Sequence, residues 1–118
     1  MKSRAPGLDC ELPALASALK AIGGKWKIQI ICLLFSGTKR FGELRRLLVG
    51  VHRGTLTYEL RGLEAAGIIQ RTQHLTIPPT VEYSLTTQGI ALEPVILALS
   101  HWREATKETP SASLHKNK

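Results

Sequence analysis

The spacing of three leucines in residues 51–64, VHRGTLTYELRGLE, constrains the fold more than any other feature of this chain. Leu56, Leu60 and Leu63 recur at helical intervals, so they predict a helix over roughly residues 52–66 that turns its leucines toward a core. The other side of this helix is unusual for a surface that meets only water. It carries cations, hydroxyl groups and a glycine, namely Arg53, Gly54, Thr57, Tyr58 and Arg61.

A shorter helix precedes this one. Residues 41–48, FGELRRLL, have apolar side chains at helical spacing and leave Arg45 and Arg46 outward. The tight sequence Val49-Gly50-Val51 joins the two predicted helices. Two helices connected by a short turn that contains glycine form the helix-turn-helix arrangement.

The pattern changes to strands after the second of these helices. Residues 68–74 and 81–85 predict two strands, because apolar and polar residues alternate in the second run. Pro78 and Pro79 lie in the loop between them, where regular pairing is prevented. A hairpin directly after a helix-turn-helix makes the unit a winged helix.

Further helices flank this unit. Residues 11–22 and 25–36 predict two helices before it, and the second is so densely apolar that it is expected to be the most buried. After the hairpin, Thr86 or Thr87 can cap a long fifth helix. Pro94 is expected to kink that helix or to mark the end of its first turn.

The expected fold is therefore mainly α with a small β-hairpin. A length of 118 residues suits one compact domain, which we place at residues 11–106 as a winged helix-turn-helix with terminal helices. Residues 1–10 and 107–118 are polar and are expected to be flexible. No apolar run approaches the roughly 18 residues that span a bilayer, and no signal-peptide pattern opens the chain, so a soluble cytoplasmic protein is expected.

Positive charge is concentrated in the middle of the chain. The formal net charge is +7, and residues 25–71 hold nine Lys or Arg against three Glu, a net of +6. A concentrated positive field indicates a polyanionic partner such as DNA, RNA or an anionic membrane surface.

The helix over residues 52–66 is the expected recognition helix. A winged helix sets its second helix in the major groove, whose floor offers base edges and whose walls are phosphate. Arg61, one turn deeper than Thr57, is expected to reach either a base edge or a phosphate. The hairpin is expected to approach the minor groove or flanking phosphates. The candidate DNA contacts are Arg40, His52, Arg53, Gly54, Thr55, Thr57, Tyr58, Arg61, Arg71 and His74.

Enzyme and metal chemistry have no sequence support. The chain has no glycine-rich phosphate loop, nucleophile elbow or paired carboxylates, and its four histidines are not at metal-ligand spacing, so neither an enzyme nor a cofactor is expected. Cys10 is a candidate redox sensor, but Asp9 and Glu11 flank it and disfavour a thiolate. Cys32 lies within an apolar run and is expected to be a small core residue.

Two alternatives to a sequence-specific DNA-binding regulator stay open. A winged helix can serve as a protein-interaction module, although such a module does not need the central positive charge. The same charge also suits an RNA-binding protein or a nonspecific, chromatin-type DNA-binding protein. Binding to specific and random DNA at one salt concentration separates the first hypothesis from the last.

The assembled motifs resemble the HxlR-type family of bacterial and archaeal winged-helix transcriptional regulators. The resemblance covers about residues 15–103, and the order and spacing of its pieces make it specific. The matching pieces are IGGKW (22–26), RFGEL (40–44), the leucine run from Leu56 to Glu64, GII-x-R (67–71), PPTVEYSLT (78–86), G-x-x-L-x-P-V (89–95) and Trp102.

The resemblance implies a homodimeric repressor or activator of a pseudo-palindromic operator, joined through its N-terminal and C-terminal helices. The apolar stripe from Leu92 to Trp102 agrees, because it exceeds what a helix packed on a small domain requires. A small-molecule effector has room between these helices and the core, but no residue pattern identifies one. The expected dimer residues are Leu15, Leu19, Leu92, Val95, Ile96, Leu99 and Trp102.

The chain departs from the family pattern in two places. Where relatives usually begin the recognition helix with Ser, this chain has His52, a poorer N-cap, followed by Arg53 and Gly54. Because glycine lowers helix propensity, the free helix is expected to begin nearer Thr55 and to tighten on DNA. Many members also carry Cys-Pro near the N-terminus, whereas Cys10 is followed by Glu and lies further from IGGKW.

Overall fold

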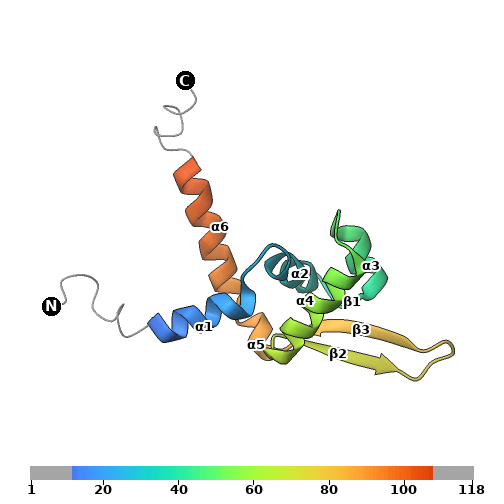
Figure 1. The fold of residues 1–118 in the computed structure, drawn as a ribbon. Helices are drawn as coiled ribbons and strands as arrows, with labels where there is room; N and C mark the ends of the chain where they lie inside the picture. Colours follow the sequence, from blue (N-terminus) through green and yellow to red (C-terminus); the bar gives the residue numbers. More distant parts are fainter. Residues whose placement is uncertain (1–11, 108–118) are drawn as a thin grey trace.

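The computed structural model describes residues 12–107, so the predicted flexible segments fall outside it except for Lys107, which is helical. Six helices and three strands make up this part of the chain (Figure 1). The elements are α1 (Leu12–Ile22), α2 (Lys27–Phe35), β1 (Lys39–Arg40), α3 (Phe41–Leu47), α4 (Arg53–Ala65), β2 (Ile69–His74), β3 (Thr80–Leu85), α5 (Thr87–Ile90) and α6 (Glu93–Lys107). The mainly α winged helix-turn-helix fold is confirmed.

The core lies where α2, α3 and α4 meet the start of β2. As the helical spacing predicted, the three leucines of α4 point inward, and α2 contributes a large share of the buried side chains. Each fully buried Leu or Ile contributes about 1.5–3 kcal/mol relative to an exposed one. The largest fully buried side chains are Ile30, Ile31, Leu44, Leu56, Leu60, Leu63 and Ile69.

The predicted hairpin is part of a three-stranded antiparallel sheet in the order β1-β3-β2. β2 and β3 pair with Arg71 opposite Tyr83, and Glu82 lies opposite Thr72. The third strand, β1, pairs with the other edge of β3 and was not predicted. Two residues are too few to show the alternation that identifies a strand in a sequence.

The single long C-terminal helix predicted from the sequence is divided into α5 and α6. Thr86 caps α5 as expected, because its Oγ1 accepts a hydrogen bond from Gly89 N at 3.1 Å. Pro94 lies in the first turn of α6, where it has no N–H to donate and its ring excludes a continuous helix through Ile90. The expected interruption is therefore present, as a complete break.

Thr86 also ties this break to the end of α4. Its Oγ1 lies 2.6 Å from the carbonyl oxygen of Gly67 and 3.0 Å from that of Ile68, toward which it donates. The backbone N of Thr86 donates to Ile68 O at 3.0 Å. A Cβ added to Gly89 would overlap the same Ile68 carbonyl. The segment that leads into α6 is therefore packed against the α4–β2 junction.

Cys32 is not a core residue, so that prediction was wrong. Its side chain is exposed, although neighbouring atoms remove enough water to raise the pKa of its thiol above the ordinary value. The helical period explains the error: Ile30, Ile31 and Leu34 face the core, and Cys32 lies on the opposite side of α2. Because apolar residues fill most positions of α2, the sequence did not show which side of the helix faces the core.

The two terminal helices project from the core. Figure 1 shows α1 and α6 leaving it in different directions, on the side away from the tip of the β2–β3 hairpin. No residue of α6 is fully buried. Within residues 12–107, no helix combines the length and the hydropathy required to cross a membrane.

Candidate nucleic-acid interface

The turn between α3 and α4 has the geometry expected of a helix-turn-helix. Gly50 adopts a φ of 90°, a left-handed conformation that glycine takes without strain. Val51 follows it, is buried, and donates its N–H to Leu48 O at 3.1 Å. This turn allows the side chains of both helices to enter one core.

Helix α4, the expected recognition helix, begins at Arg53, so the prediction of a start nearer Thr55 was wrong. His52 is the N-cap in extended backbone conformation and makes no side-chain cap hydrogen bond. The first turn is nevertheless closed, because Leu56 N donates to His52 O at 2.9 Å. Thr57 Oγ1 also donates to Arg53 O at 3.0 Å. Burial of Leu56 compensates for the weak cap and for Gly54.

The outer face of α4 is free of intramolecular cover. Arg53, Gly54, Tyr58 and Arg61 are all exposed, and Tyr58 keeps 69% of its surface accessible. Thr55 and Thr57 are half-buried, with Thr57 already bonded to its own helix. The guanidinium of Arg53 lies over the ring of Phe41, 5.4 Å from its centroid, which orients it across the turn.

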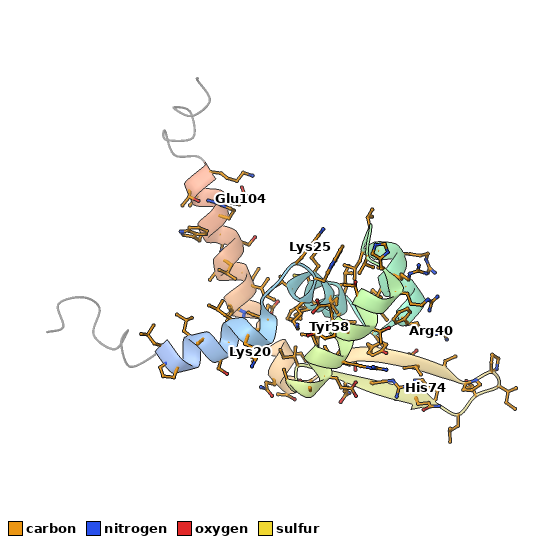
Figure 2. All side chains as sticks on the ribbon, in the orientation of Figure 1. Lys20, Lys25, Arg40, Tyr58, His74 and Glu104 are labelled. Carbon is orange, nitrogen blue, oxygen red and sulfur yellow. The ribbon has the colours of Figure 1, made fainter. Side chains whose placement is uncertain are left out.

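Cationic side chains continue onto the neighbouring elements. Arg40 is the N-cap of α3, where its backbone N donates to Glu43 Oε1 at 2.8 Å, and it is exposed. Arg45 and Arg46 are exposed on the same helix. In Figure 2 the labelled Tyr58, Arg40 and His74 lie on α4, β1 and the hairpin, away from the terminal helices.

Of the two DNA contacts predicted on the hairpin, one side chain is free within the part of the chain that the structure describes, and the other has a partner within the protein. Arg71 is exposed on β2, whereas His74 Nε2 lies 2.8 Å from Glu82 Oε1 on β3. Glu82 was not identified from the sequence, although the antiparallel register brings it beside His74. The tip of the hairpin exposes Leu75 and Ile77, two apolar residues that the sequence pattern had not singled out.

An ion pair supports α4 from beneath. Lys27 Nζ of α2 lies 2.8 Å from Glu59 Oε1 of α4, and their side chains are only 15% and 17% exposed. A Cβ added to Gly62 would lie 3.3 Å from Lys27 Cε, so the glycine leaves room for the lysine stem. Neither Lys27 nor Glu59 belonged to the predicted interface.

The predicted dimer residues fall into two groups. Leu92 and Ile96 are half-buried and pack against the core. The other five are exposed: Leu15, Leu19, Val95, Leu99 and Trp102. Leu12 and Leu97, which were not predicted, add to the exposed apolar surface of the same helices.

A mostly apolar groove of about 530 Å³ lies beside these helices. Ala14 and Ala18 of α1, Ile68 after α4, and Leu92 and Val95 at the start of α6 are among its lining residues. This is the place at which a small-molecule effector was expected. Its walls offer few polar groups that would identify a ligand.

The remaining site predictions concern metals and thiols. Within residues 12–107, no group of three or more His, Cys, Asp or Glu side chains is arranged to hold a metal ion. Cys10 lies outside the described residues. The described interface is therefore built from arginines, hydroxyl groups and one exposed tyrosine.

A helix-turn-helix followed by a hairpin, with an exposed cationic face on its second helix, defines the winged-helix class of proteins. The family model described as HxlR-like helix-turn-helix matches residues 21–111. The chain belongs to this family and is an HTH-type transcriptional regulator, and the two curated relatives described next carry regulator names.

Two curated relatives from Bacillus subtilis (strain 168) illustrate the similarity. The HTH-type transcriptional regulator YdeP is 42% identical over 113 residues, which cover 92% of this chain and 88% of YdeP. YybR, another HTH-type regulator, is 43% identical over 90 residues, which cover 76% of this chain and 72% of YybR.

Solved structures agree with the fold. A transcriptional regulator of the MarR family from Enterococcus faecalis V583 matches with a TM-score of 0.80 and 39% identity, covering 93% of this chain and 99% of that one. The redox regulator HypR in its reduced form matches with a TM-score of 0.77 and 39% identity, covering 84% and 98%.

Proposed function

We propose that this regulator binds a pseudo-palindromic operator as a homodimer, with α4 of each protomer in the major groove of duplex DNA. The observation that carries the proposal is the outer face of α4. Arg53, Tyr58 and Arg61 are exposed there, while Leu56 and Leu60 anchor the reverse side in the core. A face with positive charge and hydroxyl groups suits a groove of base edges and phosphates.

The first turns of α4 are assigned to the base edges. Arg53 and Gly54 lead this helix, and the missing side chain of Gly54 permits close approach to the groove floor. Tyr58 is assigned to phosphate or sugar. Arg40 lies beside α3, where a helix-turn-helix meets the DNA backbone, and Arg71 extends the contacts onto the hairpin.

Exposed apolar side chains on α1 and α6 support the dimer. Leu19, Leu99 and Trp102 are each more than half exposed in one protomer. Burying such a surface against a second copy removes apolar area from water. A two-fold dimer would place the two α4 helices about 34–36 Å apart, or a multiple of that distance, to match successive major grooves.

Comparative DNA titration tests this function. The duplex that lies upstream of the gene is compared with a shuffled duplex of equal length and base composition, by fluorescence anisotropy at one salt concentration. The upstream duplex is expected to bind roughly 10³-fold more tightly or better. Equal affinity for both would favour nonspecific binding, and absence of binding to both would favour a protein-interaction module.

Two variants show whether the assigned face is used. Arg53→Gln removes a cation from the first turn of α4 and is expected to weaken binding to the upstream duplex by roughly tenfold. Lys107→Gln removes the same charge from the far end of α6 and should leave the affinity within about twofold. Equal losses in both variants would contradict a site on α4.

Redox sensing is not part of the proposed function. HypR is named a redox regulator, whereas a reactive thiol needs positive surroundings that stabilise its thiolate. Asp9 and Glu11 flank Cys10 in the sequence, and burial raises the pKa of Cys32. Both effects disfavour the reactive form of cysteine.

A further inference from the structure

A polar notch of about 330 Å³ lies between the recognition helix and the hairpin. Both elements contribute arginine to it, and it is distinct from the apolar groove beside α1. Its lining residues are Thr57, Leu60, Arg61 and Glu64 of α4, Arg71 of β2 and Tyr83 of β3.

The sheet register explains why the two arginines share this space. Arg71 lies two residues after the buried Ile69, so both side chains leave β2 on the face covered by the helices. Its cross-strand partner, Tyr83, packs against the core on that face. Arg61 lies one turn after Thr57 on α4 and enters the same notch from above the sheet.

Neither arginine is neutralised by a neighbour. Within residues 12–107, the guanidinium groups of Arg61 and Arg71 make no hydrogen bond, ion pair or ring contact. Other cations nearby are engaged, since Lys27 pairs with Glu59 and Arg53 lies over Phe41. Glu64 follows Arg61 by three residues, yet no ion pair joins it to either arginine.

Two unpaired guanidinium groups around one notch repel each other until an anion lies between them. A phosphate group has several acceptor oxygens, and arginine presents planar sets of N–H donors that match them. We propose that Arg61 and Arg71 together hold one backbone phosphate of the duplex, with the hydroxyl groups of Thr57 and Tyr83 beside it.

This inference rests on the proposed function and narrows it. The sequence left Arg61 free to read a base edge or to bind phosphate, and the shared notch favours phosphate. Arg61 then positions α4 along the groove without reading sequence. Base recognition is left to the first turns of the helix, around Arg53 and Gly54.

The salt dependence of DNA binding tests whether one phosphate is shared. Each neutralised phosphate contributes about −0.9 to the slope of log K against log salt. Wild-type protein, Arg61→Gln, Arg71→Gln and the double variant are titrated with the upstream and shuffled duplexes between about 50 and 200 mM salt. Circular dichroism confirms that each variant is folded, and Lys107→Gln is the charge-matched control.

A shared phosphate predicts a non-additive result. Each single variant should weaken binding to both duplexes while its slope stays close to wild type, because one arginine still neutralises the phosphate. The double variant should bind roughly tenfold more weakly and lose about 0.9 of slope per protomer. Glu64→Gln removes a repelling charge and should strengthen binding to both duplexes.

Other results would overturn the inference in recognisable ways. A slope loss of about 0.9 per protomer in each single variant, doubled in the double variant, would mean two separate phosphates. A loss confined to the upstream duplex would make Arg61 a base contact. If inorganic phosphate raises the melting temperature of wild type but not of the double variant, while both bind DNA with equal slopes, the notch holds a free phosphate. Failure of wild type to bind either duplex would reject the proposed function itself.

Discussion

Lys27 and Glu59 lie 32 residues apart in the chain, yet their charged atoms meet at 2.8 Å between α2 and α4. Little water reaches either group, so each charge depends on the other for solvation. Gly62 opens the path along which the lysine stem crosses α4. At the scale of single residues, this pair orients the recognition helix on the core.

Replacing Lys27 with Met is expected to destabilise the fold by about 1–3 kcal/mol, because the carboxylate of Glu59 is left without a partner. The double variant Lys27→Met/Glu59→Met should recover much of that loss, since no charge remains stranded. Urea unfolding followed by circular dichroism measures both. Equal midpoints for wild type and Lys27→Met would show that the pair contributes nothing to stability.

Residue-level prediction succeeded where local spacing decides burial and failed where distant contacts do. Leu56, Leu60 and Leu63 were placed correctly because a helix repeats every 3.6 residues. Cys32 was misplaced, because the residues before and after it in the sequence are apolar and suggested burial. The Lys27–Glu59 pair and the notch around Arg71 depend on how elements pack, which no local pattern encodes.

At the scale of elements, the start of α4 combines a weak cap with a flexible residue. His52 makes no side-chain cap hydrogen bond, and Gly54 has the lowest helix propensity short of proline. Beyond the adjacent residues and the backbone of α4 itself, no atom lies within 4 Å of a Cβ built on Gly54, so alanine fits in the free protein. The same Cβ would project toward the proposed groove.

Gly54→Ala is therefore expected to separate stability from DNA binding. It should stabilise the fold by about 0.5–1 kcal/mol and weaken binding to the upstream duplex, because the added methyl group prevents close approach. Thermal unfolding and anisotropy titration report the two effects. Unchanged affinity with raised stability would remove Gly54 from the interface.

The boundaries of helices were predicted well where glycine residues mark a turn or a helix end. Gly50 and Gly67 both have positive φ: Gly50 lies in the expected turn between α3 and α4, and Gly67 follows the expected end of α4. β1 escaped prediction because its two residues are defined only by pairing with β3. Pro94 indicated the interruption before α6, but the packing of Thr86 and Gly89 against Gly67 and Ile68 had no signal in the sequence.

At the scale of the whole molecule, the face proposed for DNA and the helices proposed for the dimer lie on different sides of one protomer (Figures 1 and 2). The positively charged face of α3, α4 and the hairpin lies away from the apolar helices α1 and α6 (Figures 1 and 2). Leu99 and Trp102 expose 51% and 59% of their surface on α6. Such a division suits a protein that uses one side for DNA and the other for a second copy.

Leu99→Glu is expected to convert the proposed dimer to a monomer, because it would bury an unpaired carboxylate between the two copies. His101→Glu introduces the same charge two positions along α6 and should leave the dimer intact. Sedimentation velocity distinguishes the two states. A Leu99→Glu protein that still sediments as a dimer would place the interface elsewhere.

The anchorage of Thr86 to Gly67 and Ile68 has a mechanical consequence for such an assembly. α6 is thereby attached to the end of α4 that lies away from the helix-turn-helix turn, so a movement of α6 would be transmitted to α4. In a two-fold dimer, the angle at which the two α6 helices cross would then set the distance between the two α4 helices. A change of a few degrees in that angle would alter the spacing of the two α4 helices, so that they no longer match successive turns of DNA. No residue that contacts DNA would need to change.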